Sequence, residues 1–295
     1  MSIEIEKFNQ YYGKKQILHS IDLKIEKGMY GLLGRNGAGK STLMKTLATL
    51  LPCKEGEIVM EGIPVQHQKE IRSIIGYLPQ DFSMYGNMSV YDVLDYLGIL
   101  SDMKTTVRKE RIKLVLEQVN LTVHKKTKVK AMSGGMRRRL GIAQALLHDP
   151  KILIVDEPTA GLDPEERLRF RNLLAEIADQ RIVLLSTHIA GDIEAVAENL
   201  AILDQGKIIY SGTVAQLLHL AEGHVFTVRI PRTELAAVKE QVQVIALYQE
   251  GSHIDVRFIG KKMRKIMEHP LLLEAAPTLE DAYLYILQQK AGVDR

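Results

Sequence analysis

The residues with the clearest chemical potential form one glycine-rich stretch: Gly34, Arg35, Asn36, Gly37, Ala38, Gly39, Lys40, Ser41 and Thr42. Their spacing is G-x-x-x-x-G-K-[ST]. The three glycines tolerate positive φ and carry no Cβ, so the backbone N–H groups can converge on an anion. Lys40 can reach the terminal phosphates of a nucleotide, and the Ser41 hydroxyl can bind Mg²⁺. The stretch therefore predicts a phosphate-binding loop.

Two acidic residues follow a second apolar stretch. Residues 152–155 are apolar, and Asp156 and Glu157 come directly after them. Such a run is typical of a strand buried on both faces of a parallel sheet, and open α/β sheets bind ligands at the carboxyl ends of their strands. An aspartate there can hold Mg²⁺, and an adjacent glutamate can polarise a water molecule. The alternative is a strand that ends in two solvated acids.

Strands and helices alternate around these residues, which predicts an α/β fold. We expect a strand at 29–33 before the loop and a helix after it that ends at Pro52. A strand at 182–185 leads to His188, and Asp163 caps a helix. Further strands are expected at 3–8, 17–27, 57–60, 74–78, 200–203 and 208–210, with a turn at 11–15 and a helix at 213–221. The stretch 85–147 has a helical pattern and contains a basic run at 124–139, which indicates a solvated face or an anion contact.

The composition changes near residues 222–224. Beyond this point we expect strands at 225–230, 242–248 and 254–259 and a final helix at 279–289. This tail contains no metal-ligand spacing and no pairing of a nucleophile with a base. It is predicted to be a small α+β unit.

Bulk properties restrict the class of protein. The chain has 295 residues, a net charge of +3 and one cysteine, Cys53, so it cannot form an intrachain disulfide. The charge is too small to indicate nucleic-acid binding by itself. The sequence has no apolar run of 18 residues and begins without the features of a signal peptide. We therefore expect a cytoplasmic protein that reaches a membrane only through a partner.

In their order and spacing, the motifs of residues 1–220 resemble those of the nucleotide-binding subunit of an ABC transporter. Residues 34–42 resemble its Walker A loop and residues 152–157 its Walker B strand. The other matches are the Q-loop at Gln80, the signature at Ser133, Gly134, Gly135 and Met136, the D-loop at Ala160, Gly161, Leu162 and Asp163, the switch histidine at His188 and the adenine-stacking aromatic at Tyr12. Met136 stands where the signature usually has glutamine.

The resemblance implies a fold class. It is a P-loop NTPase core with a mainly parallel sheet, an antiparallel β subdomain and a helical subdomain at about 85–147. These parts form an ATPase domain at 1–222, and a small C-terminal α+β accessory domain follows at 223–295. The implied cofactors are ATP and Mg²⁺.

The resemblance also implies roles for single residues. Glu157 would be the general base, with His188, Gln80 and Lys40 as further catalytic residues. The metal would be held by Ser41, Gln80 and Asp156. The residues implied to bind ATP are Tyr12, Gly34, Asn36, Gly37, Ala38, Gly39, Lys40, Ser41 and Thr42, with Ser133, Gly135 and Asp163 at the contact with an opposite subunit.

The implied partners are a transmembrane permease and a second ATPase subunit, in a homodimer or heterodimer, on the cytoplasmic face of the cell membrane. The run at 277–283 resembles the C-terminal segment of drug- and antibiotic-exporting members, which favours export; an importer is the alternative. Another alternative is a soluble ATPase of ribosomes or DNA, although no nucleic acid is expected. The tail would be regulatory, ligand-binding or purely structural.

Overall fold

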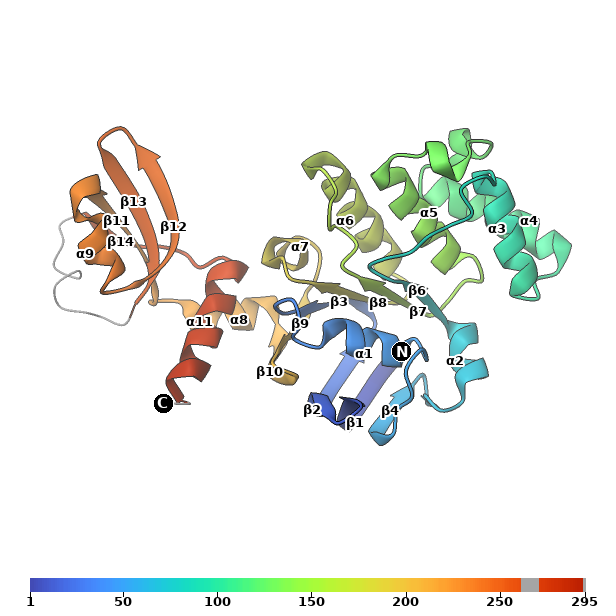
Figure 1. The fold of residues 1–295 in the computed structure, drawn as a ribbon, viewed down its shortest axis with the longest axis horizontal. Coiled ribbons are helices and arrows are strands. Elements are labelled where there is room, and N and C mark those ends of the chain that lie inside the picture. The colour runs from blue at the N-terminus through green and yellow to red at the C-terminus, as the bar shows by residue number, and fades with distance from the viewer. Residues whose placement is uncertain (261–270, 294–295) are drawn as a thin grey trace. The chain divides into compact units, whose positions relative to one another are not determined.

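The computed structural model describes residues 1–260 and 271–293 (Figure 1). It divides the chain into two compact units, Met1–Ser211 and Gly212–Arg295. Helix α8 (Val214–Ala221) belongs to the second unit, where it packs against α11 (Leu279–Val293). The expected domain boundary after residue 222 lies beyond α8 and remains a prediction.

A six-stranded sheet forms the centre of the first unit, in the order β10-β9-β3-β8-β7-β6. Its strands are β3 (Gly28–Leu33), β6 (Ile75–Leu78), β7 (Ile152–Asp156), β8 (Ile182–Thr187), β9 (Asn199–Asp204) and β10 (Lys207–Thr213). The strands from β9 to β6 pair in parallel. Every residue of β7 and β8 is buried, as their apolar sequences predict.

Helices cover both faces of this sheet. Helix α1 (Lys40–Leu47) lies on one face, and α6 (Pro164–Ala178) and α7 (Ala190–Glu194) lie on the other (Figure 1). The apolar face of α1 joins the main core through Leu43 and Leu47, together with Ile154 of β7. This packing holds the start of α1 against the strand ends that carry the predicted chemistry.

An antiparallel sheet covers the outer side of α1, in the order β2-β1-β4-β5. Its strands are β1 (Ser2–Tyr12), β2 (Lys15–Glu26), β4 (Glu55–Met60) and β5 (Ile63–Pro64). The predicted turn at 11–15 is shorter than expected, because β1 continues through Tyr12 and pairs it with Lys15. Gly13, with φ of 59°, makes the reversal possible.

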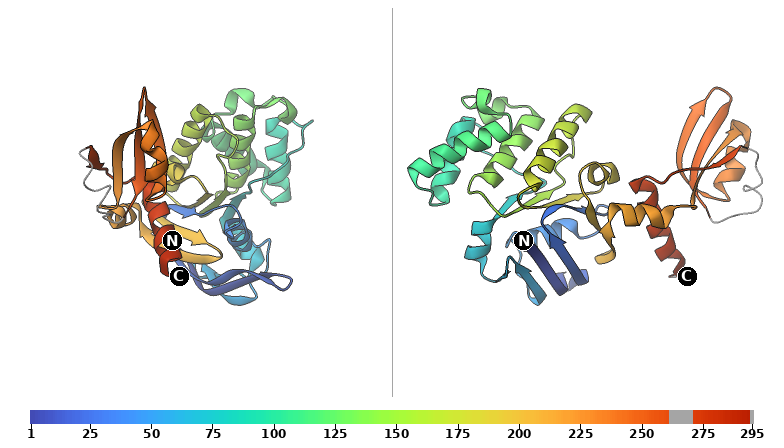
Figure 2. Two further views of the ribbon diagram at one scale, coloured as in Figure 1. Left: turned by 60° about the vertical axis from the view of Figure 1, so that its left-hand side comes forward. Right: turned by 180° about the vertical axis from the view of Figure 1, so that it is seen from behind.

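Three further helices of the first unit lie together in every view (Figures 1 and 2). They are α3 (Val90–Leu100), α4 (Thr105–Gln118) and α5 (Gly134–Leu146), with short helical turns at Thr122–His124 and Val129–Ala131. Helix α2 (Gln68–Ile74) lies apart from them and contacts β5 and β6. Ser89 begins α3 through a capping box with Asp92. Within the described residues, no helix is long and apolar enough to span a bilayer.

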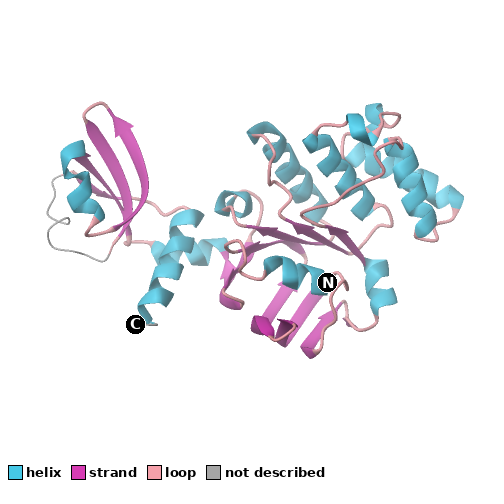
Figure 3. Cartoon of the chain, viewed as in Figure 1, coloured by secondary structure: helices cyan, strands magenta, loops and turns pink. Residues whose placement is uncertain are grey.

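The second unit combines a four-stranded sheet with helices (Figure 3). The strand order is β12-β13-β11-β14. Its elements are β11 (Val225–Pro231), a helical turn at Arg232–Glu234, α9 (Leu235–Lys239), β12 (Gln243–Glu250), β13 (His253–Ile259) and β14 (Leu272–Glu274), besides α8 and α11. Phe226, Val256 and Phe258 form a separate small core with Val238 of α9. The predicted α+β character of the tail is therefore present.

Candidate functional site

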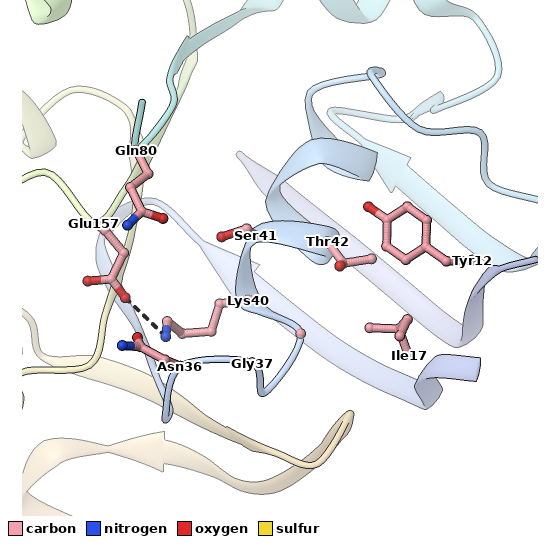
Figure 4. A pocket seen from close by; sticks show the side chains of 10 residues that line it. Tyr12, Ile17, Asn36, Gly37, Lys40, Ser41, Thr42, Gln80 and Glu157 are labelled. Atoms are coloured by element: carbon pink, nitrogen blue, oxygen red, sulfur yellow. Dashed lines mark ion pairs between the residues drawn. The ribbon is translucent and has the colours of Figure 1, made fainter. Parts of the chain in front are cut away.

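A pocket of about 460 Å³ opens at the carboxyl ends of the parallel strands (Figure 4). Its lining combines the glycine-rich loop with residues from four other segments of the chain. The lining residues are Tyr12, Ile17, Asn36, Gly37, Gly39, Lys40, Ser41, Thr42, Gln80 and Glu157. The structure thus brings together most of the residues that we predicted from separate motifs.

The glycines of the loop differ in why they are needed. Gly37 and Gly39 have φ of 81° and 111°, as expected for a loop that turns its N–H groups toward a ligand. Gly34 is not in this conformation, so the part of our reason that rested on positive φ was wrong for it. A Cβ on Gly34 would lie 2.3 Å from the Leu203 carbonyl oxygen, so this glycine allows close packing against β9. Gly34 and the buried Ala38 belong to the loop but do not line the pocket.

Lys40 is held at the first turn of α1. Its side chain is buried, and Nζ donates hydrogen bonds to the Gly34 carbonyl at 2.8 Å and the Arg35 carbonyl at 3.3 Å. Nζ also forms an ion pair with Glu157 Oε1 at 3.0 Å (Figure 4). Glu157 Oε1 accepts no hydrogen bond from any described residue. The ammonium is therefore neutralised inside the pocket by a partner that an anionic ligand can replace.

The two carboxylates at the carboxyl end of β7 have different surroundings. Asp156 is buried and accepts a hydrogen bond from the Ser186 hydroxyl of β8, and it is not among the residues that line the pocket. Glu157 has φ of 48°, an unfavourable conformation for a side-chain-bearing residue that is often found at functional sites. Its N–H donates to the Ser186 carbonyl at 3.1 Å. His188 Nδ1 lies 2.7 Å from Glu157 Oε2, so the histidine reaches the site through this carboxylate.

Gln80 enters the pocket from the segment after β6 and is supported by Arg138 of α5. Arg138 NH1 donates to the Gln80 carbonyl at 2.7 Å, and its guanidinium lies 5.4 Å from the centroid of the Phe82 ring. Burial lowers the pKa of Arg138, which is partly offset by the nearby Asp81 carboxylate. Arg138 belongs to the basic run for which we expected a solvated face or an anion contact. In the structure Arg138 instead binds the backbone carbonyl of Gln80.

The structure does not bring Ser133, Gly135 and Asp163 to the pocket of their own chain. The Ser133 hydroxyl caps α5 by accepting from Met136 N at 3.2 Å, and the Asp163 carboxylate caps α6 by accepting from Glu166 N at 2.9 Å. A Cβ on Gly135 would meet the Glu166 carboxylate of α6, so this glycine leaves room for that side chain.

Sequence reasoning missed two residues that contribute to the site. Ile17 of β2 lines the pocket beside Tyr12 (Figure 4), and nothing separates it in the sequence from other apolar strand residues. Ser186 of β8 bonds to the Asp156 carboxylate and to the Glu157 backbone N–H. It could have been found, because it directly follows the apolar residues 182–185 at the same sheet edge as Asp156.

A glycine-rich loop facing a carboxylate across the ends of parallel strands defines a protein of the P-loop NTPase class. Residues 18–160 match the family described as ABC transporter. The linearmycin resistance ATP-binding protein LnrL of Bacillus subtilis is 34% identical over 218 residues, which are 73% of this chain and 70% of that protein. The Nod factor export ATP-binding protein I of Cupriavidus pinatubonensis is 34% identical over 219 residues, 73% and 67% of the two chains.

The fold agrees with these sequence matches. The structure of cbiO1 from Clostridium perfringens, described as part of the ABC transporter complex cbiONQ, superposes with a TM-score of 0.67 at 25% identity and covers 74% of this chain and 93% of that one. The chain belongs to the ABC transporter family, as an ATP-binding protein with the ABC-type P-loop fold. This confirms the predicted fold class and the family resemblance.

Proposed function

We propose that this chain hydrolyses ATP to ADP and phosphate and thereby powers export through a separate membrane permease. The observation that carries the proposal is the pocket in which Lys40 Nζ faces Glu157 Oε1 at 3.0 Å. A cation placed for phosphate and a carboxylate placed for water lie within contact distance there, at the sheet edge where this class of fold binds ligands.

The loop and Tyr12 would hold the nucleotide. The N–H groups around Gly37 and Gly39 and the positive end of α1 favour the phosphates, with Asn36 and Thr42 beside them. Tyr12 lines the other side of the pocket, where its ring can stack on adenine. The phosphates would replace Glu157 as the partner of Lys40, which frees the carboxylate to act on water.

The residues present fit a magnesium ion. Ser41 and Gln80 line the pocket, and Asp156 ends the strand directly before Glu157. Hydroxyl, amide and carboxylate oxygens are the hard ligands that Mg²⁺ prefers. When bound, the ion would neutralise charge on the phosphates. Glu157 would then accept a proton from the attacking water, with His188 Nδ1 holding the opposite carboxylate oxygen.

We infer from the signature residues that a second subunit completes the site. Ser133 is exposed at the start of α5, Asp163 is exposed at the start of α6, and neither lines the pocket of its own chain. In the proposed head-to-tail dimer these residues and Gly135 would face ATP held by the partner. ATP would close the dimer and hydrolysis would reopen it.

Export rests on the names of relatives: one confers linearmycin resistance and another serves Nod factor export. Since no described helix can span a bilayer, the proposed transport path lies in the permease, and the chain would work at the cytoplasmic face of the membrane. Co-purification of the chain with a permease, and ATP-dependent efflux from vesicles that contain both, would test this step. Uptake in place of efflux would contradict it.

Substitution of Glu157 tests the chemistry. Glu157→Gln should keep Mg·ATP binding, lower turnover by about 10²- to 10⁴-fold and let a closed dimer accumulate. Turnover is measured by phosphate release and the dimer by size-exclusion chromatography with ATP. Lys40→Ala should lose binding, and Glu165→Gln on the exposed side of α6 is the control. Normal hydrolysis by Glu157→Gln would refute the assigned base.

A further inference from the structure

Asp192 of α7 is a carboxylate without exposed surface. Thr159 Oγ1 donates a hydrogen bond to Asp192 Oδ2 at 2.6 Å, and Arg167 Nε donates to Oδ1 at 2.6 Å. The guanidinium of Arg171 lies 3.7 Å from the same Oδ1. A buried charge is tolerated only when its partners replace water, and here a hydroxyl and two guanidinium groups do so.

The partners of Asp192 come from the segments that carry the candidate catalytic residues. Thr159 lies two residues after Glu157, in the loop between β7 and α6. Asp192 lies four residues after His188, in the helix that follows β8. Arg167 extends from the first turns of α6. One carboxylate therefore joins the loop after Glu157 to the helix after His188.

The link through Asp192 connects the two segments beyond the point where their strands stop pairing. The pairing of β7 with β8 stops at Asp156 and Ser186, and beyond these residues the two segments continue into different loops. The Glu157 N–H still reaches Ser186, but nothing in the strand ladder holds Glu157 Oε2 at 2.7 Å from His188 Nδ1. The hydrogen bond between Thr159 and Asp192 joins the same two segments at a second point.

We propose that Asp192 is a positioning residue that sets the distance between Glu157 and His188, an inference that rests on the proposed function. Asp192 is not in the lining of the pocket, so it acts through the two loops and not on the nucleotide. Its loss should therefore reduce turnover while leaving ATP affinity intact, because a small displacement of a reacting group weakens catalysis strongly.

The test compares Asp192→Asn, Thr159→Val and Asp192→Glu in the full chain. Asparagine keeps the shape but removes the charge and one acceptor oxygen, and valine removes only the hydroxyl. Both should lower kcat by about 10- to 100-fold with the Kd for Mg·ATP within about twofold of the unmodified chain. Asp192→Glu should recover part of kcat, and the control Glu165→Gln, which breaks an exposed ion pair with Arg169, should change neither value.

A double-variant cycle separates positioning from general destabilisation. In a His188→Ala background, Asp192→Asn should lower kcat by less than about twofold, because the contact that it positions is already gone. A full multiplicative loss, a Kd that rises as much as kcat falls, or normal kcat in both single variants would overturn the inference. If Asp192→Asn does not fold, Thr159→Val decides alone. Absence of turnover in the unmodified chain would overturn the proposed function, and the inference with it.

Discussion

At the scale of single residues, the central feature is a buried ion pair that a ligand can exchange. Lys40 and Glu157 lie in the same pocket, and each has a second set of contacts that keeps it in place, the loop carbonyls for Lys40 and His188 for Glu157. Removing one partner of such a pair without replacement is costly, whereas phosphate supplies Lys40 with a new partner. Under the proposed function, the site would thus be organised for an anionic ligand before that ligand binds.

Tyr12 and Tyr11 offer a matched pair for testing adenine stacking. Tyr12 lines the pocket with 48% of its surface exposed, whereas Tyr11 is 40% exposed, is not in the lining and bonds to Glu55. Tyr12→Ala should raise the Kd for ATP by about tenfold, because base stacking on an aromatic ring contributes about 1–3 kcal/mol. Tyr12→Trp should retain the affinity.

Titration with a fluorescent ATP analogue measures this difference. Tyr11→Ala serves as the control and should bind ATP like the unmodified chain. Equal losses in Tyr11→Ala and Tyr12→Ala would show that the effect comes from the β1 strand end and not from stacking.

At the scale of elements, the run at 277–283 has a structural explanation. Thr278 N donates to Asp281 Oδ2 at 2.8 Å and Asp281 N donates to Thr278 Oγ1 at 3.3 Å, a reciprocal cap at the start of α11. Arg257 of β13 donates to the same carboxylate from Nε at 3.1 Å. The motif that resembles exporter tails therefore fastens α11 to the sheet of the second unit.

The pH dependence of the stability that the Asp281 contacts contribute can be predicted. Burial raises the pKa of Asp281, but Arg257 and the Thr278 bonds outweigh it and hold the pKa below its usual range. A carboxylate whose pKa is lower in the folded state stabilises the fold above its unfolded pKa, about 3.9, and this stabilisation is lost as pH falls through the folded pKa. Asp281→Asn should cost about 2 kcal/mol at pH 7, and the difference should shrink below about pH 4.

Amide hydrogen exchange of α11 as a function of pH measures that cost. The control is Asp255→Asn, because Asp255 pairs with Arg229 on the exposed surface of the same sheet and should contribute less. A stability difference that is the same at pH 3 and pH 7 would contradict the role of the Asp281 charge.

At the scale of the whole molecule, the nucleotide site and the tail belong to different units. Every residue that lines the pocket lies within Met1–Ser211, and the second unit has its own core. A chain that ends at residue 222 should therefore bind Mg·ATP with a Kd within about twofold of the full chain, since distant sites act independently.

Calorimetry on the truncated chain measures this affinity, and a chain that ends at residue 213 tests the boundary. The longer variant keeps α8 without α11, its packing partner, and should be the less soluble of the two. Loss of ATP binding in a truncated chain that is folded by circular dichroism would show that the tail supports the site.

The parts of the site that could be predicted from sequence are those whose functional residues lie close together in the chain. The loop at 34–42 needs its glycines, lysine and serine at fixed spacing, and the two acids directly follow the apolar residues 152–155, so local pattern revealed both. The positions of the principal strands and the start of α6 followed from the same periodicity and capping signals.

Local spacing was thus enough to identify the class of fold, the phosphate loop and the paired acids, because short-range backbone geometry dictates them. Tertiary packing alone decided that Gly34 is needed for contact with β9, that Arg138 holds Gln80, and that Asp192 joins the segments of Glu157 and His188. These contacts join residues far apart in the chain, and their side chains have no local pattern. Only the folded sheet and the helices packed on it bring such partners within bonding distance.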